Sequence, residues 1–176
     1  MLFQVRELEI KPVRFDQVYA AGEFNFLDEG LSQVSPLVAK GSAEFLESVG
    51  EIHVSGELQV KLAFACDRCL ESAEFAVERT FDLYYRPATE LSGEEEVALK
   101  EDETEMGFFD GEAVALEEIL REQVLLALPV QKLCRKDCKG LCPSCGVNLN
   151  QGSCACVPAV TATGWGAALR EIKLSK

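Results

Sequence analysis

Residues 51–85 read EIHVSGELQVKLAFACDRCLESAEFAVERTFDLYY. In the first half most even positions from Ile52 to Phe64 are apolar, and in the second half most odd positions from Ala73 to Tyr85 are. An apolar residue at every second position is typical of half-buried antiparallel strands. The pattern predicts a β-hairpin whose tip, ACDRCLES, contains two cysteines, Cys66 and Cys69.

Further segments extend this hairpin into a larger sheet. Residues 37–45 repeat the alternation more weakly, and SVG at 48–50 predicts the turn that follows them. Residues 3–10 and 13–19 have the composition of two more strands. Consecutive strands of this kind form a meander, most simply a curved antiparallel sheet or a partial barrel.

One long helix is predicted near residues 113–128. Apolar residues recur there at helical spacing, and Pro129 marks the end. The apolar stripe consists of Leu116, Ile119, Leu120, Val124, Ala127 and Leu128. We therefore expect an α+β fold in which this helix covers the sheet.

Composition divides the chain into two regions. Residues 1–130 form an acidic, β-rich body, in which residues 87–112 are expected to be an acidic surface loop. Residues 131–176 form a Cys-rich segment that packs on the body. A short terminal helix in this segment is predicted from Trp165, Leu169 and Ile172.

The net charge of −13 is unevenly distributed. From residue 131 onward there are seven bases and two acids, a net charge of +5, and the preceding 130 residues carry −18. An acidic body repels a bare phosphate backbone, because affinity for nucleic acid comes largely from cationic side chains. Its field favours basic partners, although surface acids also simply keep a protein in solution.

Eight cysteines accompany a single histidine. Residues 1–15 contain no signal or transit peptide, and the chain has no run of about 18 apolar residues, so we expect a cytoplasmic location. In a reducing compartment, closely spaced cysteines indicate bound metal more than disulfides. Zinc is favoured over an iron–sulfur cluster because the ferredoxin motif is absent. It is favoured over thiol redox chemistry because a redox CxxC normally begins a helix in a βαβ unit.

Eight thiolates suffice for two tetrahedral Cys₄ sites. One division forms a first site from Cys66, Cys69, Cys134 and Cys138 and a second from Cys142, Cys145, Cys154 and Cys156. The other division pairs the two CxxC motifs, Cys66–Cys69 and Cys142–Cys145, as a zinc ribbon does. Spacing alone leaves both divisions open. In either division, the site that contains Cys66 and Cys69 joins the hairpin tip to the C-terminal segment.

The metal is expected to be structural and the protein not to be an enzyme. Catalytic zinc usually has histidine or carboxylate ligands and an open position, whereas His53 falls on the polar face of a strand, away from every motif. No P-loop, HExxH or GxSxG motif is present. Several bases lie beside the cysteines and are interpreted as compensating the thiolate charge, with RNA contact as the alternative: Arg68, Lys132, Arg135, Lys136 and Lys139.

The order of these motifs resembles the YceD family, the large ribosomal RNA subunit accumulation proteins. The resemblance covers about residues 50–156 and rests on CDRCL, a helix that ends in LLALP, and CRKDCKGLCPSCGVNLNQGSCAC. It implies a role in accumulation or maturation of large-subunit ribosomal RNA. All eight cysteines match the family pattern, and members differ in how many C-terminal cysteines they keep. That variation favours the division in which Cys66 and Cys69 pair with Cys134 and Cys138.

Three functional hypotheses follow. In the first, the acidic body acts through a basic large-subunit ribosomal protein or assembly factor. In the second, the positively charged C-terminal segment contacts ribosomal RNA directly. In the third, the protein is a zinc or redox sensor in which Cys142 and Cys145 oxidise reversibly and release metal.

Overall fold

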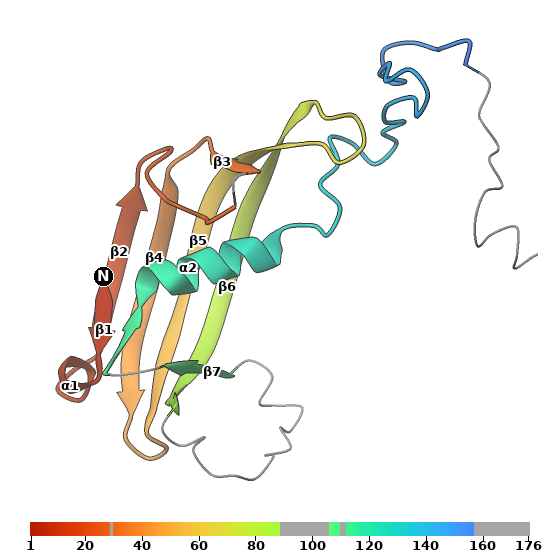
Figure 1. Ribbon diagram of the computed structural model, residues 1–176. Helices are drawn as coiled ribbons and strands as arrows, with labels where there is room; N and C mark the ends of the chain where they lie inside the picture. The colour runs from red at the N-terminus through yellow and green to blue at the C-terminus, as the bar shows by residue number, and fades with distance from the viewer. Residues whose placement is uncertain (29, 89–105, 110–111, 157–176) are drawn as a thin grey trace, which may run out of the picture.

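The computed structural model describes residues 1–28, 30–88, 106–109 and 112–156 (Figure 1). Two helices and eight strands make up this part of the chain, and one twisted sheet dominates it. The elements are β1 (Leu2–Gln4), α1 (Val5–Leu8), β2 (Val13–Tyr19), β3 (Leu31–Gln33), β4 (Leu37–Leu46), β5 (Glu51–Ala65), β6 (Ser72–Pro87), β7 (Met106–Phe109), β8 (Ala113–Ala115) and α2 (Leu116–Ala127).

The predicted hairpin is confirmed as the longest feature of the sheet. β5 and β6 pair without interruption from Ile52↔Tyr85 to Ala65↔Ser72. At the tip the amide of Cys66 donates to the carbonyl of Glu71 at 2.9 Å. Cys66 and Cys69 therefore lie in the turn, at the end of the sheet that is far from α1.

The sheet is open, so the prediction of a partial barrel is wrong. Its strand order is β2-β4-β5-β6-β7, and β7 runs parallel to β6, which also corrects the purely antiparallel meander. β3 pairs with β5 rather than with its neighbours in the sequence. The reason is length: β5 has 15 residues and β4 has ten, so β3 occupies the part of β5 that β4 does not reach.

Helix α2 lies across one face of the sheet and forms the core with it (Figure 1). The single long helix expected near 113–128 is not shown, because residues 113–115 form a strand, α2 has 12 residues, and a second short helix, α1, is present. Of the predicted stripe, Leu116, Ile119, Leu120 and Val124 are buried, and Ala127 and Leu128 are partly buried. Helix α2 begins at Leu116 because the three residues before it form β8, which pairs with β1.

The N-terminal prediction is correct for one segment and wrong for part of the other. Residues 13–19 form β2 as expected. Residues 3–10 do not form one strand, since β1 ends at Gln4 and α1 follows over Val5–Leu8. The short helix buries Leu8, and the amide of Val5 donates to the carbonyl of Glu112 at 2.9 Å.

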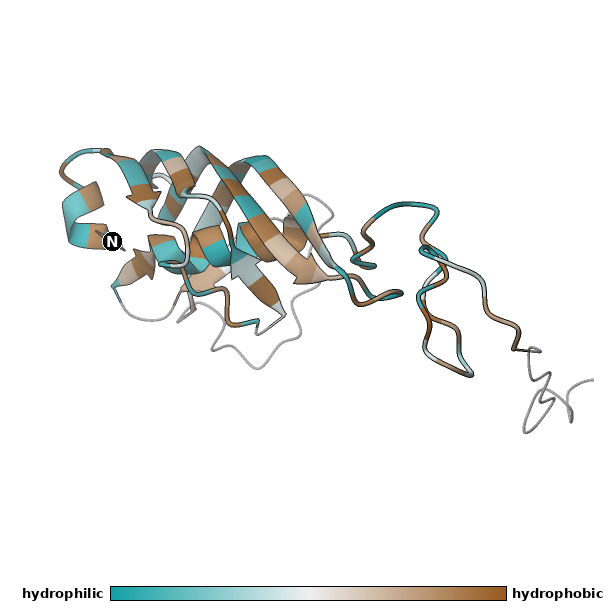
Figure 2. Ribbon diagram, turned by 90° about the horizontal axis from the view of Figure 1, so that it is seen from above, coloured by the Kyte–Doolittle hydropathy of each residue, from teal (hydrophilic) through white to brown (hydrophobic). Residues whose placement is uncertain are grey.

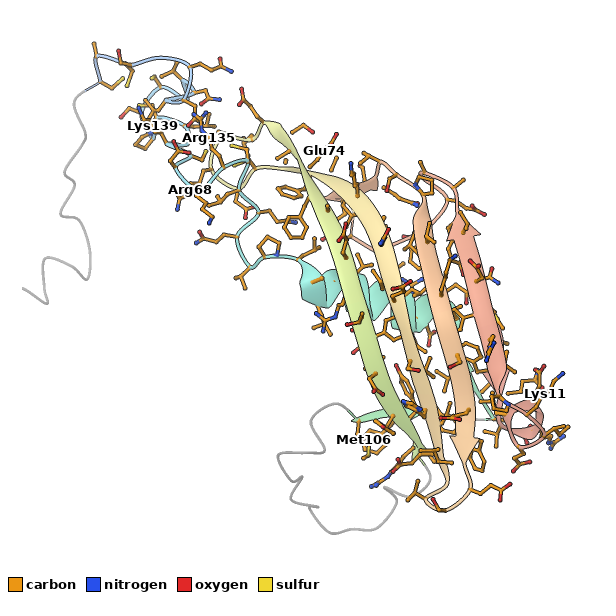
Figure 3. The ribbon with its side chains drawn as sticks, turned by 180° about the vertical axis from the view of Figure 1, so that it is seen from behind. Lys11, Arg68, Glu74, Met106, Arg135 and Lys139 are labelled. Carbon is orange, nitrogen blue, oxygen red and sulfur yellow. The ribbon has the colours of Figure 1, made fainter. Side chains whose placement is uncertain are left out.

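The opposite face of the sheet is polar and exposed. Viewed from behind, the side chains of β2, β4, β5 and β6 on this face are not covered by a helix (Figure 3). The alternation of hydrophilic and hydrophobic residues along each strand is visible from above (Figure 2). This alternation produces one buried and one solvated face, as the period of two predicts.

Two predicted features fall partly or wholly outside the described residues. The expected acidic loop at 87–112 contains strand β7, so it is not a loop throughout, and residues 89–105 and 110–111 are not described. The terminal helix predicted around Trp165 also lies outside the described residues. Neither helix in the described part of the chain has the length and apolar character needed to cross a membrane.

Candidate metal centres

The cysteines form two groups of four, and the division is the first of the two considered above. Group 1 consists of Cys66, Cys69, Cys134 and Cys138, and group 2 consists of Cys142, Cys145, Cys154 and Cys156. Within each group all sulfur atoms lie within 4.8 Å of one another. The alternative that joins the two CxxC motifs in one site is wrong for this structure.

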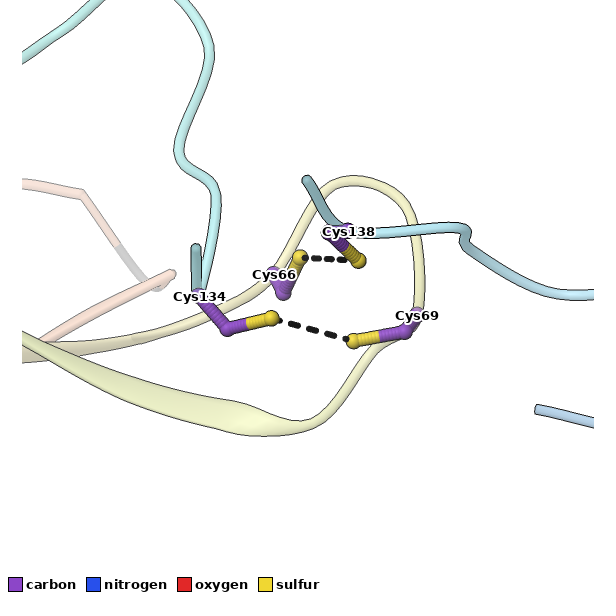
Figure 4. A group of neighbouring side chains, drawn as sticks. All are labelled: Cys66, Cys69, Cys134 and Cys138. Atoms are coloured by element: carbon purple, nitrogen blue, oxygen red, sulfur yellow. Dashed lines mark hydrogen bonds between the residues drawn. The ribbon is translucent and has the colours of Figure 1, made fainter. Parts of the chain in front are cut away.

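The geometry of group 1 fits one tetrahedral metal ion. The Cys66 and Cys138 sulfurs are 3.8 Å apart, and those of Cys69 and Cys134 are 3.6 Å apart (Figure 4). A tetrahedron with metal–sulfur bonds of about 2.3 Å has sulfur–sulfur edges of about 3.8 Å. A disulfide needs a separation of about 2.05 Å, which neither pair approaches. The sulfurs therefore have the spacing of ligands to a shared ion.

Backbone hydrogen bonds hold the two halves of group 1 together. The hairpin tip and the segment before Cys134 exchange bonds, since Asp67 N donates to Lys132 O at 2.8 Å and Lys132 N donates to the Asp67 carboxylate at 2.6 Å. On the other side Leu141 N donates to Arg68 O at 2.9 Å. The guanidinium of Arg68 donates to Cys138 O at 3.0 Å. These contacts bring residues about 70 positions apart into one site.

Amide groups around Cys66 favour its thiolate. Burial raises the pKa of this thiol, but backbone amides of Cys134, Arg68 and Cys69 outweigh it and lower the pKa to about 6. Burial and the neighbouring sulfurs instead raise the pKa of Cys134 to about 12. Four thiolates this close repel one another unless a cation lies between them. The spacing and charge of the group therefore allow it to hold a positive ion.

Group 2 is a local structure within the C-terminal segment. Its CxxC motif closes a turn in which Gly146 N donates to Cys142 O at 2.9 Å and Cys142 N donates to Val147 O at 2.8 Å. Gly146 has φ of +73°, a left-handed conformation that glycine adopts without steric cost. Cys142 is buried, whereas Cys145 and Cys156 are exposed.

The electrostatics of group 2 repeat those of group 1. Backbone amides of Cys145 and Ser144 lower the pKa of Cys142 to about 6. The neighbouring sulfur of Cys145 raises the pKa of Cys156 to about 12. Each group therefore contains at least one thiol whose pKa backbone amides lower, Cys66 in group 1 and Cys142 in group 2. Each also contains at least one thiol whose pKa is raised, Cys134 in group 1 and Cys156 in group 2.

Asn150 connects the two groups, a role that the sequence analysis did not identify. Its side-chain amide donates to the Cys138 sulfur at 3.3 Å, although Asn150 follows the CxxC motif of group 2. Its side-chain oxygen accepts bonds from Lys139 N at 2.8 Å and from the Arg135 guanidinium at 2.9 Å. The two asparagines of the VNLN stretch were the available signal, since asparagine is common in turns, where its side chain bonds to nearby backbone.

The bases that flank the cysteines have different environments. Arg68 and Arg135 donate the hydrogen bonds described above, and Lys132 lies 3.8 Å from the Asp28 carboxylate. Lys136 and Lys139 are exposed. Figure 3 shows Arg68, Arg135 and Lys139 together at the cysteine end of the molecule.

His53 lies on the polar face of β5, where the sequence placed it, and far from the cysteines in the fold. Its side chain is only 18% exposed, because the ring lies between the carboxylates of Glu44 and Asp82 and stacks on Tyr84 at 4.7 Å. Burial lowers its pKa, but the hydrogen bonds to the two carboxylates outweigh this effect and raise it. The residue belongs to the sheet surface and not to either cysteine group.

The fold and the site define a class: a β-sheet protein whose main hairpin presents a CxxC motif to a second cysteine pair from a C-terminal segment. The sequence profile of the family named large ribosomal RNA subunit accumulation protein YceD matches residues 54–173. The chain belongs to the YceD family. The matched region includes all but the first three residues of the hairpin and all eight cysteines.

Similarity to individual proteins extends over more than half of the chain. An uncharacterized protein of Mycobacterium tuberculosis is 36% identical over 107 residues, which are 59% of this chain and 48% of the relative. A chloroplastic maize protein named large ribosomal RNA subunit accumulation protein YCED homolog 1 is 27% identical over 62% of this chain and 45% of its own length. The uncharacterized Bacillus subtilis protein YlbN is 22% identical over 82% of this chain and 79% of its own.

The matched region of this chain spans about half the length of the mycobacterial and maize relatives. No solved structure matches the chain. The comparisons thus establish the family, and the arrangement of the sheet and the cysteine groups comes from the structure described above.

Proposed function

We propose that this protein is a non-enzymatic factor for the accumulation of large-subunit ribosomal RNA. In this proposal it acts in the cytoplasm through a basic ribosomal protein or assembly factor, and two zinc ions stabilise its structure. The observation that carries the proposal is the pair of Cys₄ groups in a chain of the YceD family. The description of the family and the name of the maize relative supply the link to ribosomal RNA.

The sulfur geometry supports zinc in a structural role. Four thiolates and tetrahedral spacing suit zinc or iron–sulfur chemistry. Sulfurs within 4.8 Å of one another leave space for one ion but not for a cluster of several iron and sulfide atoms. Four protein ligands fill the coordination shell, and a catalytic zinc keeps one position open for water or substrate. Cys66, Cys69, Cys134 and Cys138 would hold one ion, and the four cysteines of group 2 the other.

The charge distribution supports a basic partner. The first 130 residues carry a net charge of −18, and the polar face of the sheet presents the acids Glu57, Glu74, Glu78 and Asp82 on β5 and β6. Such a surface attracts cations and repels phosphate groups. An acidic protein of this kind can hold a cationic ribosomal protein until its RNA site has formed.

Complementation tests the cellular role. A bacterial strain that lacks its own family member should show a reduced ratio of large-subunit to small-subunit ribosomal RNA, and this chain should restore the ratio. The double variant Cys66→Ser/Cys69→Ser should fail to restore it, while the surface variant Val18→Thr, distant from both cysteine groups, should succeed. An unchanged RNA ratio in the deletion strain would overturn the proposal.

Native mass spectrometry tests the metal. Protein purified without chelator should carry two zinc ions and no reactive thiols, and denaturation with chelator should release eight thiols. One zinc ion and four reactive thiols would instead favour the sensor hypothesis, because group 2 would then be free for oxidation. The exposure of Cys145 and Cys156 is the observation that favours this alternative.

Direct RNA contact is the second candidate, favoured by the exposed bases Lys136 and Lys139 beside the cysteine groups. Charge reversal at Lys132, Lys136 and Lys139 should weaken association with ribosomal particles if these bases contact RNA. It should have little effect if the acidic body binds a basic protein. Ribosomal RNA that remains bound to the protein after basic proteins are stripped away would exclude the indirect model.

A further inference from the structure

Strand β6 is an edge of the sheet over most of its length. On one side it pairs with β5 along the whole hairpin, and on the other side β7 pairs only with Tyr84–Pro87. Among the residues that the structure describes, no strand pairs with the outer side of Ser72–Leu83. Figure 1 shows this side of β6 facing away from the other long strands.

The register identifies the backbone groups at this edge. Cys66 N donates to Glu71 O, so these opposite residues form a hydrogen-bonded pair. Such pairs alternate along an antiparallel ladder, and the odd residues of β6 therefore direct their amides and carbonyls toward β5. The even residues direct theirs outward at Ser72, Glu74, Ala76, Glu78, Thr80 and Asp82.

Among the described residues, this edge lacks three of the features that usually prevent strand addition. Proline, a β-bulge or a cover of another element normally blocks an exposed edge strand. Residues 72–83 contain no proline, and their register with β5 has no bulge. This stretch carries the acids Glu74, Glu78 and Asp82 against one base. The acids disfavour edge-to-edge pairing of two copies of this chain and favour a basic strand.

A hollow beside the same edge can accept side chains of an added strand. It lies between β6, the start of β7 and α2, and it is lined by Phe81, Tyr85, Met106, Glu122 and Leu126 among others. Leu126 is 61% exposed although it is a large apolar residue of the helix.

The hollow has a net negative charge as well as an apolar wall, because Asp82 and Glu122 line it together with one base, Arg79, which donates a hydrogen bond to Gln123. Burial raises the pKa of Tyr85, and the charges of Glu122 and Glu118 raise it further. An apolar wall with a carboxylate suits the long side chain of lysine or arginine, whose stem is apolar and whose end is cationic.

We propose that the outer edge of β6 from Ser72 to Leu83 binds a basic protein segment in extended conformation, which joins the sheet as a further strand. The inference rests on the proposed function, since it specifies how the basic partner is held. Main-chain hydrogen bonds would supply affinity, and the acids beside the edge would select for positive charge.

Hydrogen exchange on the full-length, metal-loaded protein tests this inference with a defined probe. The probe is an eight-residue peptide that alternates lysine and valine, and its control alternates glutamate and valine. The lysine peptide should slow exchange at the amides of Glu74, Ala76, Glu78, Thr80 and Asp82. Exchange at the amides of Phe75 and Val77 should already be slow without it, because β5 binds them. The glutamate peptide should have no effect.

A pair of proline variants supplies the matched comparison. Ala76→Pro removes one outward amide of β6, and Val18→Pro makes the same change on the outer side of β2, the other edge strand. Ala76→Pro should weaken peptide binding about tenfold or more, since an amide–carbonyl bond is lost and the proline ring blocks its neighbours. Val18→Pro should leave binding unchanged, and melting temperatures establish that both variants are folded.

Several results would overturn the inference. Protection of other amides, equal binding of the glutamate peptide, or equal effects of the two proline variants would each show that β6 is not the binding edge. The proposed function would survive these results, because complementation of ribosomal RNA levels and binding of basic proteins elsewhere on the body are measured separately. A different result is protection of the even-numbered β6 amides by the lysine peptide together with failure of the chain to restore ribosomal RNA levels. It would support β6 as a binding edge and exclude the proposed role in ribosomal RNA accumulation.

Discussion

The two cysteine groups have the same ligand types but different places in the fold. Group 1 joins the tip of the β5–β6 hairpin to the C-terminal segment, and three of its four cysteines are buried. Group 2 takes all four cysteines from within 15 residues, and two of them are exposed. Group 1 therefore links distant parts of the chain, whereas group 2 orders only its own turn.

If each group holds an ion, as proposed, this difference predicts which of the two ions stabilises the body. An ion that binds the folded state and not the unfolded chain adds its binding free energy to folding. For group 1 the binding free energy stabilises the contact between the hairpin and the C-terminal segment, because its cysteines are up to 72 residues apart. For group 2 it stabilises the local turn.

Replacing Cys69 with serine is expected to have the largest effect. The loss of one ligand of group 1 should lower the free energy of unfolding of the body by about 4 kcal/mol when free zinc exceeds its dissociation constant about a thousandfold. Chemical denaturation monitored through the sheet measures this change. Cys145→Ser makes the same chemical change in group 2. Equal losses of unfolding free energy in the two variants would show that the two groups contribute equally to the stability of the body.

Gly140→Ala should have the next largest effect, because Gly140 lies at the junction of the hairpin tip and the C-terminal segment. It has φ of +73°, and an added Cβ would lie 2.9 Å from the carbonyl oxygen of Arg68. Left-handed backbone costs about 1–2 kcal/mol for alanine, and the close contact should add about 1–2 kcal/mol.

Gly146→Ala is the matched control for that change. Gly146 also has φ of +73°, but nothing lies within 4 Å of its added Cβ. It should therefore show only the backbone cost, confined to the turn of group 2. Thermal unfolding and zinc content of both variants measure the difference. A larger loss of stability from Gly146→Ala would contradict the conclusion that group 1 links distant segments and group 2 orders only a local turn.

Cys145→Ser should remove one zinc ion while changing the stability of the body by less than about 1 kcal/mol. Native mass spectrometry measures the ion count, and denaturation measures the stability. In the unmodified protein, a chelator should release the group 2 ion first, after which Cys145 and Cys156 should react with iodoacetamide before Cys66. Earlier alkylation of Cys66 would contradict the order that exposure predicts.

His53→Asn should have the smallest effect on stability. It tests the surface of the sheet without changing either cysteine group. The pKa of His53 is raised in the folded protein, so the folded state binds this proton more tightly than the unfolded state does. The contribution of this proton to folding stability is fully present below a pH of about 6.5. It disappears as the pH rises through the pKa that His53 has in the folded protein.

The variant should therefore lose more stability relative to the original protein at pH 5.5 than at pH 8.5. The difference between the two proteins cancels the pH dependence of the thiolates, which both retain. Denaturation of both proteins at the two pH values measures it. A larger loss at pH 8.5 would show that Glu44 and Asp82 do not stabilise the protonated ring.

Local patterns predicted most of the central elements. The alternation over 51–85 was sufficient for β5 and β6, and the stripe from Leu116 to Val124 was sufficient for α2. The segment 3–10 was assigned wrongly because its apolar residues suit a strand and a helix equally over so short a length. Only the pairing of β1 with β8 decides where the strand ends.

The strands β3 and β7 were not predicted, since each has three or four residues and pairs outside the sequential order. Their positions depend on the lengths of β5 and β6, which leave unpaired backbone for them. The same reasoning explains the incorrect prediction of a barrel, because closure depends on how much each strand is staggered relative to the next, and no local pattern specifies this.

The sequence by itself determined the hairpin with its CxxC tip, the covering helix, the acidic body and the eight cysteines as candidate ligands. These features depend on residue type and short-range period, which a chain carries wherever it folds. Only the tertiary structure decided the division of the cysteines, the bridging role of Asn150 and, among the described residues, the unpaired outer edge of β6. Each of these depends on distances between residues far apart in the chain, which spacing along the sequence does not specify.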